Sequence, residues 1–157
     1  MTTISIVVPA YNCRPWITEL LESIRAQTYP RDRLETIVVA DGSGDASAAI
    51  ARSFLVRHAM QGTVLIGERA GAAAAMNLGW RAAAGEWIQF VSGRDVLAPN
   101  KIEVQAKLVP QLAEHVSAIF SGWQLLAHAG DQWLLTGTVH RPQLTDPIVL
   151  KLLARPP

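Results

Sequence analysis

The chain has 157 residues and a formal net charge of +1, and half of its residues are hydrophobic. That is enough apolar material for one buried core, so a disordered chain is excluded, and the scattered arginines and lysines form no basic stripe of the kind that binds nucleic acid. One cysteine, Cys13, permits no intramolecular disulfide, and we interpret it as a small loop residue in a reducing compartment rather than as a nucleophile. We expect neither a signal peptide nor a transmembrane segment, and therefore a cytoplasmic protein, with attachment to the inner face of the membrane left open.

Short apolar runs alternate with amphipathic stretches through the first two thirds of the chain. The run that begins at Ile4 is continuous and β-branched, as is typical of a strand buried on both faces of a parallel sheet, and Pro9 is expected to end it. Gly85 is placed like the residue that follows a helix, and Pro110 should kink or shorten the last helix. In chain order we predict a strand at 4–8, a helix at 16–24, a strand at 35–40, a helix at 48–60, a strand at 63–66, a helix at 72–84, a strand at 87–91 and a helix at 99–113.

The last third changes pattern. A strand is predicted at 117–126, a turn at 129–131 and a second strand at 133–136, which together indicate an antiparallel hairpin. A weak helix is predicted at 144–153. Strands that alternate with helices, followed by a hairpin, predict an α/β fold: a three-layer α/β/α sandwich around a mostly parallel sheet.

Polar loops follow two of the predicted strands, and in open α/β sheets the crevice at the carboxyl ends of the strands binds ligands. After the first strand come Tyr11 and Asn12, an aromatic ring that can stack on a base and an amide that can hydrogen-bond to it. Local chemistry alone favours a simpler interpretation, in which Tyr11 terminates the strand and Asn12 caps the following helix. Asp41, after the second strand, is a candidate acceptor for a base N–H or ribose hydroxyls, or equally an Asx-turn residue bonded to the backbone of Ser43.

The third loop, Ser92-Gly93-Arg94-Asp95, contains one carboxylate. A divalent ion on a diphosphate normally takes one or two carboxylates, so a metal at Asp95 is a weak inference, and a local Arg94–Asp95 pair that caps the next element is favoured. The chain contains no Gly-x-Gly-x-x-Gly and no Gly-x-x-x-x-Gly-Lys-Ser/Thr phosphate loop, which disfavours a dinucleotide-dependent oxidoreductase.

Four separated segments agree in order and approximate spacing with a known family. The series ISIVVPAYN, LLESIRAQTYP, ETIVVADGSGD and GAAAAMNLGWRAAAGEWIQFVSGRD closely resembles the nucleotide-binding half of family 2 glycosyltransferases, which have the GT-A fold. The resemblance covers roughly residues 4 to 110. It implies one GT-A-like domain over 1–157, with the nucleotide-sugar-binding part at about 1–110 and a partial acceptor-side hairpin and tail at about 111–157.

The resemblance also implies a role for individual residues. The family's Pro-Ala-Tyr-Asn segment embraces the base of a nucleotide sugar, and its Asp-Asp-Gly-Ser segment, here Ala40 to Ser43, contacts the base through the second acid, Asp41. A third segment, from Gly71 to Asn77, lies across the nucleotide, although the family's usual Arg is Met76 here. The implied nucleotide-binding residues are therefore Pro9, Ala10, Tyr11, Asn12, Asp41, Ser43, Gly71, Asn77 and Arg94.

The chain departs from the family at the metal-binding segment. The family pattern Leu-Asp-x-Asp-Asp holds Mn²⁺ or Mg²⁺ on the sugar diphosphate, whereas this chain has Ser92 and Arg94 in place of the first two acids and retains only Asp95. Either Arg94 neutralises the diphosphate without a metal, or the domain no longer transfers sugar. The resemblance thus implies an inverting glycosyltransferase that uses a nucleotide diphosphate sugar such as a UDP-sugar, as in polysaccharide or cell-envelope synthesis. The alternative is an inactive or truncated domain that serves as a binding or scaffold partner. No motif identifies the catalytic base, for which Glu114, Asp131 and Asp146 are candidates.

Overall fold

The computed structural model of the chain divides into two compact units, residues 1–112 and 113–157, which we describe separately. It describes residues 1–112, 116, 118–119, 121–129 and 132–140. Within that part of the chain, no helix has both the length and the apolar character needed to cross a membrane.

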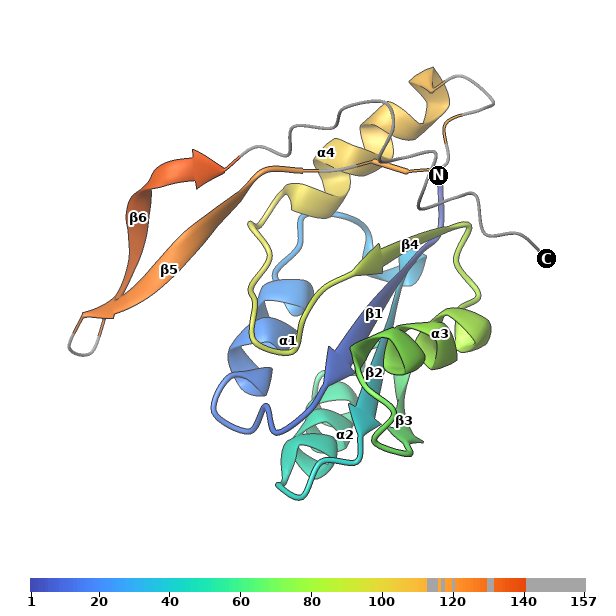
Figure 1. Ribbon diagram of the computed structural model, residues 1–157. Coiled ribbons are helices and arrows are strands. Elements are labelled where there is room, and N and C mark those ends of the chain that lie inside the picture. Colours follow the sequence, from blue (N-terminus) through green and yellow to red (C-terminus); the bar gives the residue numbers. More distant parts are fainter. Residues whose placement is uncertain (113–115, 117, 120, 130–131, 141–157) are drawn as a thin grey trace, which may run out of the picture. The chain divides into compact units, whose positions relative to one another are not determined.

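The first unit is built on a four-stranded, wholly parallel sheet (Figure 1). Its strands are β1 (Ile4–Ala10), β2 (Leu34–Asp41), β3 (Gly62–Gly67) and β4 (Trp87–Phe90), in the order β3-β2-β1-β4. The two central strands, β1 and β2, are buried on both faces along most of their length, as their continuous apolar runs predict. The predicted α/β class with a mostly parallel sheet is confirmed.

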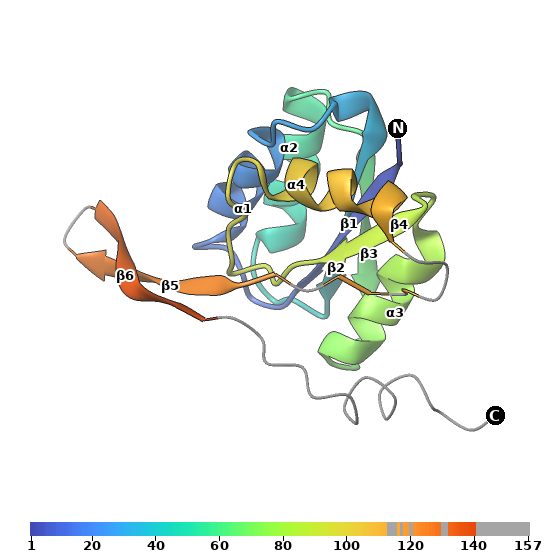
Figure 2. The same ribbon diagram turned by 90° about the horizontal axis from the view of Figure 1, so that it is seen from above.

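Helices cover both faces of this sheet, which gives the predicted three layers (Figure 2). Helices α1 (Ile17–Arg25), α2 (Ser47–Arg57) and α4 (Lys101–Leu108) share one apolar core with the β1 side chains of Ile6 and Val8. Helix α3 (Ala72–Ala82) packs on the other face, where Ala75 shares a second apolar core with Val7, Ile37 and Val39. Successive side chains of a strand point to opposite faces, so neighbouring residues of β1 serve different cores.

Strand β1 continues two residues beyond the predicted end, because Pro9 does not stop it. Pro9 pairs with Val39, and Ala10 pairs with Ala40. Proline lacks only the N–H, and the Pro9 carbonyl still accepts a hydrogen bond from the backbone N–H of Gly93 at 3.1 Å. The strand therefore carries its pairing to the edge where the polar loops begin.

Two further predictions concern helix ends. The predicted shortening at Pro110 is confirmed, since α4 ends at Leu108 and a 3₁₀ turn follows at Val109–Gln111. The helix-ending role of Gly85 is wrong: α3 ends at Ala82, and Ala83 is already extended. A Cβ on Gly85 would lie 2.5 Å from the backbone nitrogen of Ser5, so glycine is needed there for close approach to β1.

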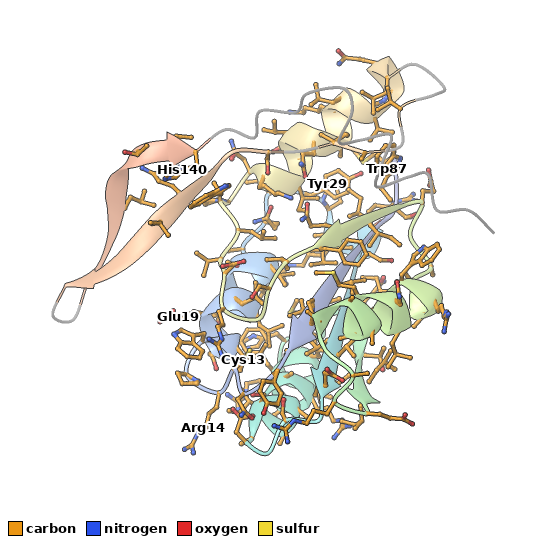
Figure 3. The ribbon with its side chains drawn as sticks, viewed as in Figure 1. Cys13, Arg14, Glu19, Tyr29, Trp87 and His140 are labelled. Atoms are coloured by element: carbon orange, nitrogen blue, oxygen red, sulfur yellow. The ribbon has the colours of Figure 1, made fainter. Side chains whose placement is uncertain are left out.

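The second unit contains the antiparallel hairpin of β5 (Trp123–Ala129) and β6 (Gln132–His140), which confirms the predicted hairpin. β5 begins later than predicted, because residues 118–119 and 121–122 lie in no strand. Trp123 is paired with His140, and their rings stack with centroids 4.1 Å apart (Figure 3). The predicted helix at 144–153 lies outside the described residues.

Candidate functional site

The polar loops of the first unit meet at the carboxyl edge of the sheet. The four strands are parallel, so the segments that follow them all emerge on that edge (Figure 1). Two hollows lie at the opposite edge; Gln61, just before β3, lines both of them, and Gly85, before β4, lines one. Among the described residues, most of the side chains that the sequence singles out lie on the carboxyl edge.

The loops after β1 and β2 are joined by a reciprocal set of hydrogen bonds. The backbone N–H of Asn12 donates to Oγ of Ser43 at 3.2 Å, and the N–H of Gly44 donates to Oδ1 of Asn12 at 3.2 Å. The Ser43 hydroxyl also donates to the carbonyl of Ala10 at 3.3 Å. Asn12 therefore fastens one loop to the other, and its predicted role as a cap of α1 is wrong, because Trp16 occupies that position.

A second set of bonds extends this junction to the start of α2. Asp45 accepts the backbone N–H of Arg14 at 2.9 Å and that of Ser47 at 3.0 Å, and the Ser47 hydroxyl also donates to it. The N–H of buried Cys13 donates to Oγ of Ser47 at 2.9 Å, so Cys13 lies at the base of the junction (Figure 3). Burial would raise the pKa of Asp45, but the hydrogen bonds it accepts outweigh burial and lower that pKa. Asp45 is thus an ionised acceptor at neutral pH.

Asp41, the last residue of β2, is a buried carboxylate with an exposed fraction of 5%. The backbone N–H of Ala70 donates to Oδ1 at 3.1 Å, and that of Gly71 donates to Oδ2 at 2.7 Å. Gly71 is the N-cap of α3 and has a φ of 90°, a conformation that favours glycine. The carboxylate of Asp41 therefore fixes the backbone at the start of α3. The Asx-turn interpretation, in which Asp41 bonds to Ser43, is wrong.

Tyr11 follows Ala10, which pairs with Ala40 directly before Asp41, so Tyr11 and Asp41 stand at the ends of neighbouring strands. Tyr11 is 41% exposed. The guanidinium carbon of Arg69 lies 5.4 Å from the centroid of its ring, a cation–π contact. Arg69 has a φ of 60°, and a Cβ on Gly42 would lie 2.5 Å from the Cβ of Arg69. Sequence reasoning missed Arg69, whose only signal was its place in a loop bounded by Gly67 and Gly71.

The Ser92–Asp95 loop is hydrogen-bonded to the end of β1. The N–H of Gly93 donates to the carbonyl of Pro9, and further along the N–H of Leu97 donates to Oγ of Ser23 in α1 at 3.0 Å. Arg94 is exposed, and its guanidinium carbon lies 4.7 Å from the ring centroid of Trp16. The predicted Arg94–Asp95 pair is wrong, since the ion pairs among the described residues do not include it.

The close packing of this loop against β1 and Cys13 requires glycine at position 93. A Cβ on Gly93 would lie 2.7 Å from Sγ of Cys13 and 3.3 Å from Cβ of Ala10. Gly93→Ala should therefore lower the free energy of unfolding by about 1–3 kcal/mol, the cost of overpacking, as measured by urea denaturation. Gly44→Ala is the matched control, because nothing lies within 4 Å of its added Cβ, and it should change stability by less than about 0.5 kcal/mol.

Making Gly93→Ala in a Cys13→Ala background tests whether the contact with the Cys13 sulfur causes the predicted loss of stability. Removing the sulfur makes room for the new methyl group, so Gly93→Ala should cost less in that background, a positive coupling in the double-mutant cycle. Equal costs in the two backgrounds would contradict the assigned contact.

Two of the predicted residues contribute to the site through their backbone, and one does not join it. Pro9 is half-buried and Ala10 is buried, and the backbone carbonyl of each accepts a hydrogen bond from a neighbouring loop. Asn77 lies in the interior of α3 with an exposed side chain. It is two residues beyond Ala75, which faces the sheet, so the helical period turns it by about 200° away from that face. The structure therefore does not bring Asn77 to Asp41.

The donor set at the carboxyl edge does not fit a preformed metal site. Among the described residues, no three His, Cys, Asp or Glu side chains lie together in a group that could hold an ion. Asp95 is the one carboxylate of its loop, and Arg94 beside it is a cation. Of the candidate catalytic bases, Glu114, Asp131 and Asp146 all lie outside the described residues.

A parallel α/β sheet with base-binding candidates at the ends of β1 and β2 defines an α/β domain of the GT-A type, the fold of nucleotide-sugar transferases. The family model for glycosyl transferase family 2 matches residues 5–122, and the chain belongs to this family.

Relatives and solved structures agree with that assignment. An uncharacterized glycosyltransferase of Rickettsia prowazekii, RP339, is 33% identical over 123 residues, which are 78% of this chain and 37% of the relative. The glycosyltransferase GlyG of Streptococcus pneumoniae is 38% identical over 100 residues, which are 64% of this chain and 33% of the relative. The chain therefore spans well under half the length of these relatives.

Among solved structures, S. aureus TarS 1–349 in complex with UDP matches with a TM-score of 0.65 and 29% identity, covering 69% of this chain and 32% of the TarS 1–349 chain. The mannosyltransferase PcManGT from Pyrobaculum calidifontis, in complex with GDP-Man and Mn²⁺, matches with a TM-score of 0.64 and 32% identity, covering 73% of this chain and 33% of that protein.

Proposed function

We propose that this chain is the donor-binding part of a glycosyltransferase. It binds a nucleotide diphosphate sugar at the carboxyl edge of the sheet, and the sugar passes to an acceptor by in-line displacement with inversion at the anomeric carbon. One observation carries the proposal: Tyr11 and Asp41 directly follow the paired residues Ala10 and Ala40, so an exposed ring on which a base can stack and a carboxylate that can accept a base N–H stand at neighbouring strand ends. The similar TarS and PcManGT were solved with UDP and GDP-Man respectively, which supports the same class of ligand.

In this proposal the residues at the edge have distinct roles. Tyr11 stacks on the base and Asp41 accepts its N–H. Asn12 and Ser43 hold the two loops in register by their mutual hydrogen bonds, and so act by positioning Tyr11. Gly71 brings the start of α3 close to the nucleotide. The further nucleotide-binding residues of the proposal are Pro9, Ala10 and Arg94.

The diphosphate requires positive charge, and we propose that Arg94 supplies it. Its guanidinium is exposed, free of ion pairs among the described residues, and held over Trp16. A guanidinium pairs with phosphate oxygens in a bidentate way, which a point charge does not. Binding through Arg94 is independent of metal, and Asp95 remains the one carboxylate at which Mn²⁺ or Mg²⁺ would be held.

Calorimetry with UDP, GDP and dTDP, each with Mn²⁺ and with EDTA, tests the proposal. We expect at least one nucleotide to bind the folded protein saturably. Absence of binding heat for all three, at more than one temperature and on protein whose fold is verified by circular dichroism, would overturn it.

One observation favours a second candidate, a domain that binds nucleotide or a protein partner without catalysis. Ser92 and Arg94 stand where the family has metal-binding acids, so the charge arrangement on which the family's transfer step depends is altered. A sugar-transfer or nucleotide-sugar hydrolysis assay on the whole natural protein distinguishes the two, since a binding module binds nucleotide without turnover. The single domain over 1–157, with a donor part at about 1–110 and an acceptor-side part at about 111–157, belongs to the same proposal, and the cytoplasmic location stays a prediction.

A further inference from the structure

A buried glutamine joins the end of α1 to the start of α4. Gln27 lies two residues beyond the end of α1 and is 7% exposed. Its amide nitrogen donates to the carbonyl of Ser23 at 3.0 Å and to the carbonyl of Ala98 at 2.8 Å. Its amide oxygen accepts the backbone N–H of Ile102, in the first turn of α4, at 3.0 Å. Both amide hydrogens are thus used, and the oxygen is used as well.

Two neighbours of Gln27 extend this attachment. The backbone N–H of Leu97 donates to Oγ of Ser23 at 3.0 Å, and the backbone N–H of Thr28 donates to the carbonyl of Pro99 at 2.9 Å. The segment that connects β4 to α4 is therefore held to the end of α1 from residue 97 to residue 102 (Figure 1).

Arg94 lies just before this held segment. Its loop is bonded at one end to the last residues of β1 and at the other end to Ser23 of α1. Between these ends, the N–H groups of Arg94 and Asp95 both donate to Ser92, so the turn is closed on itself. The place of the Arg94 guanidinium over Trp16 therefore depends on the attachments at both ends of the loop.

We propose that Gln27 is a positioning residue that holds Arg94 where it meets the diphosphate of the nucleotide, an inference that rests on the proposed role of Arg94. Gln27 is buried, so it acts through the segment that it holds rather than by touching the nucleotide. A charged side chain on a loop contributes most to binding when its supporting contacts fix it beforehand, because less ordering is then lost on binding.

The chemistry of this position requires an amide. Two carbonyls and one N–H face the side chain, and an amide supplies both donors and the acceptor in one planar group. Glutamate has the same length but would set a carboxylate against the two carbonyls. Methionine has a similar volume and length and forms none of these bonds, so it removes the attachment while it keeps the site filled.

The test is a double-mutant cycle on UDP binding, measured by calorimetry, with Gln27→Met made in the wild type and in Arg94→Ala. We expect Gln27→Met to weaken UDP binding about fivefold in the wild type and less than about twofold without Arg94, because there is then no charge to position. Gln111→Met is the matched control. The exposed Gln111 makes the same bond beyond a helix end, from its amide nitrogen to the carbonyl of Lys107 four residues earlier at 3.0 Å, and its loss should leave UDP affinity unchanged.

Gln27→Met leaves buried polar groups without partners, so circular dichroism and urea denaturation must first show that it folds. If it does not fold, Ser23→Ala takes its place in the same cycle, because it removes the attachment of Leu97 from a half-buried position and should show the same dependence on Arg94.

The outcomes separate this inference from the proposed function. Equal losses with and without Arg94 would mean that Gln27 supports only the fold, and would overturn the inference, as would unchanged UDP affinity in a folded Gln27→Met. If Arg94→Ala alone bound UDP as well as the wild type, the proposed role of Arg94 would be wrong, and this inference with it. Failure of every nucleotide to bind the folded wild type would instead remove the proposed function itself.

Discussion

Asp41→Ala is expected to lower the free energy of unfolding by about 2–4 kcal/mol and to abolish measurable nucleotide binding. The carboxylate accepts the backbone N–H groups of Ala70 and Gly71 in a site where it is almost fully buried. Hydrogen bonds to a charged group contribute about 1.5–3 kcal/mol each, and their loss leaves two donors at the start of α3 without partners. Urea denaturation measures the stability, and calorimetry with UDP measures the binding.

A matched control separates this role from the general effect of removing an acid. Asp32 is an exposed aspartate whose weak ion pair with Arg33 spans 3.6 Å, so Asp32→Ala should change the free energy of unfolding by less than about 0.5 kcal/mol. If Asp41→Ala proved as mild as Asp32→Ala, Asp41 would not hold the entry to α3. If it destabilised the protein but left UDP affinity unchanged, its contact with the base would be wrong.

Arg94→Ala should weaken nucleoside diphosphate binding by about 1.5–3 kcal/mol, the contribution of a hydrogen bond to a charged group, with little change in stability. Arg94 is exposed and packs on Trp16, so its loss removes charge from the proposed diphosphate position without opening the core. Arg94→Lys should recover only part of the affinity, because lysine keeps the charge but lacks the planar fork. Calorimetry with UDP measures each value.

The same measurement repeated with EDTA and with Mn²⁺ decides between Arg94 and a metal. If Arg94 takes the place of the ion, wild-type affinity should be the same under both conditions, and Arg81→Ala, an exposed arginine at the end of α3, should match the wild type. Loss of wild-type binding in EDTA would contradict the assignment to Arg94 and return the role to an ion held at Asp95.

Much of the fold follows from the sequence, because strands buried on both faces must be continuously apolar. The apolar runs that begin at Ile4 and Glu35 could be predicted as buried strands for this reason. Their alternation with amphipathic stretches predicted the α/β class. The end of β1 was misplaced because a proline at the edge removes one donor yet leaves a carbonyl to pair, as the Pro9–Gly93 bond shows.

The contacts of the site were harder to predict, because they join loops that are distant in sequence. Asp41 bonds to residues about thirty positions later, whereas the local Asx-turn looked equally good on composition. Arg69 carries no motif, and neither its positive φ nor its contact with Tyr11 has a sequence pattern. The departure at Ser92 and Arg94 was readable from the sequence, but the stacking of Arg94 on Trp16 required the fold.

The central claim is that a nucleotide binds at the carboxyl edge of the sheet, and a UDP titration followed by the backbone amide resonances tests it most directly. We predict that the largest shifts occur at Ala70 and Gly71, whose N–H groups bond to Asp41, and in the loop after β1 at Tyr11 and Asn12. Shifts confined to the hollows at the opposite edge, around Gln61 and Gly85, would contradict it.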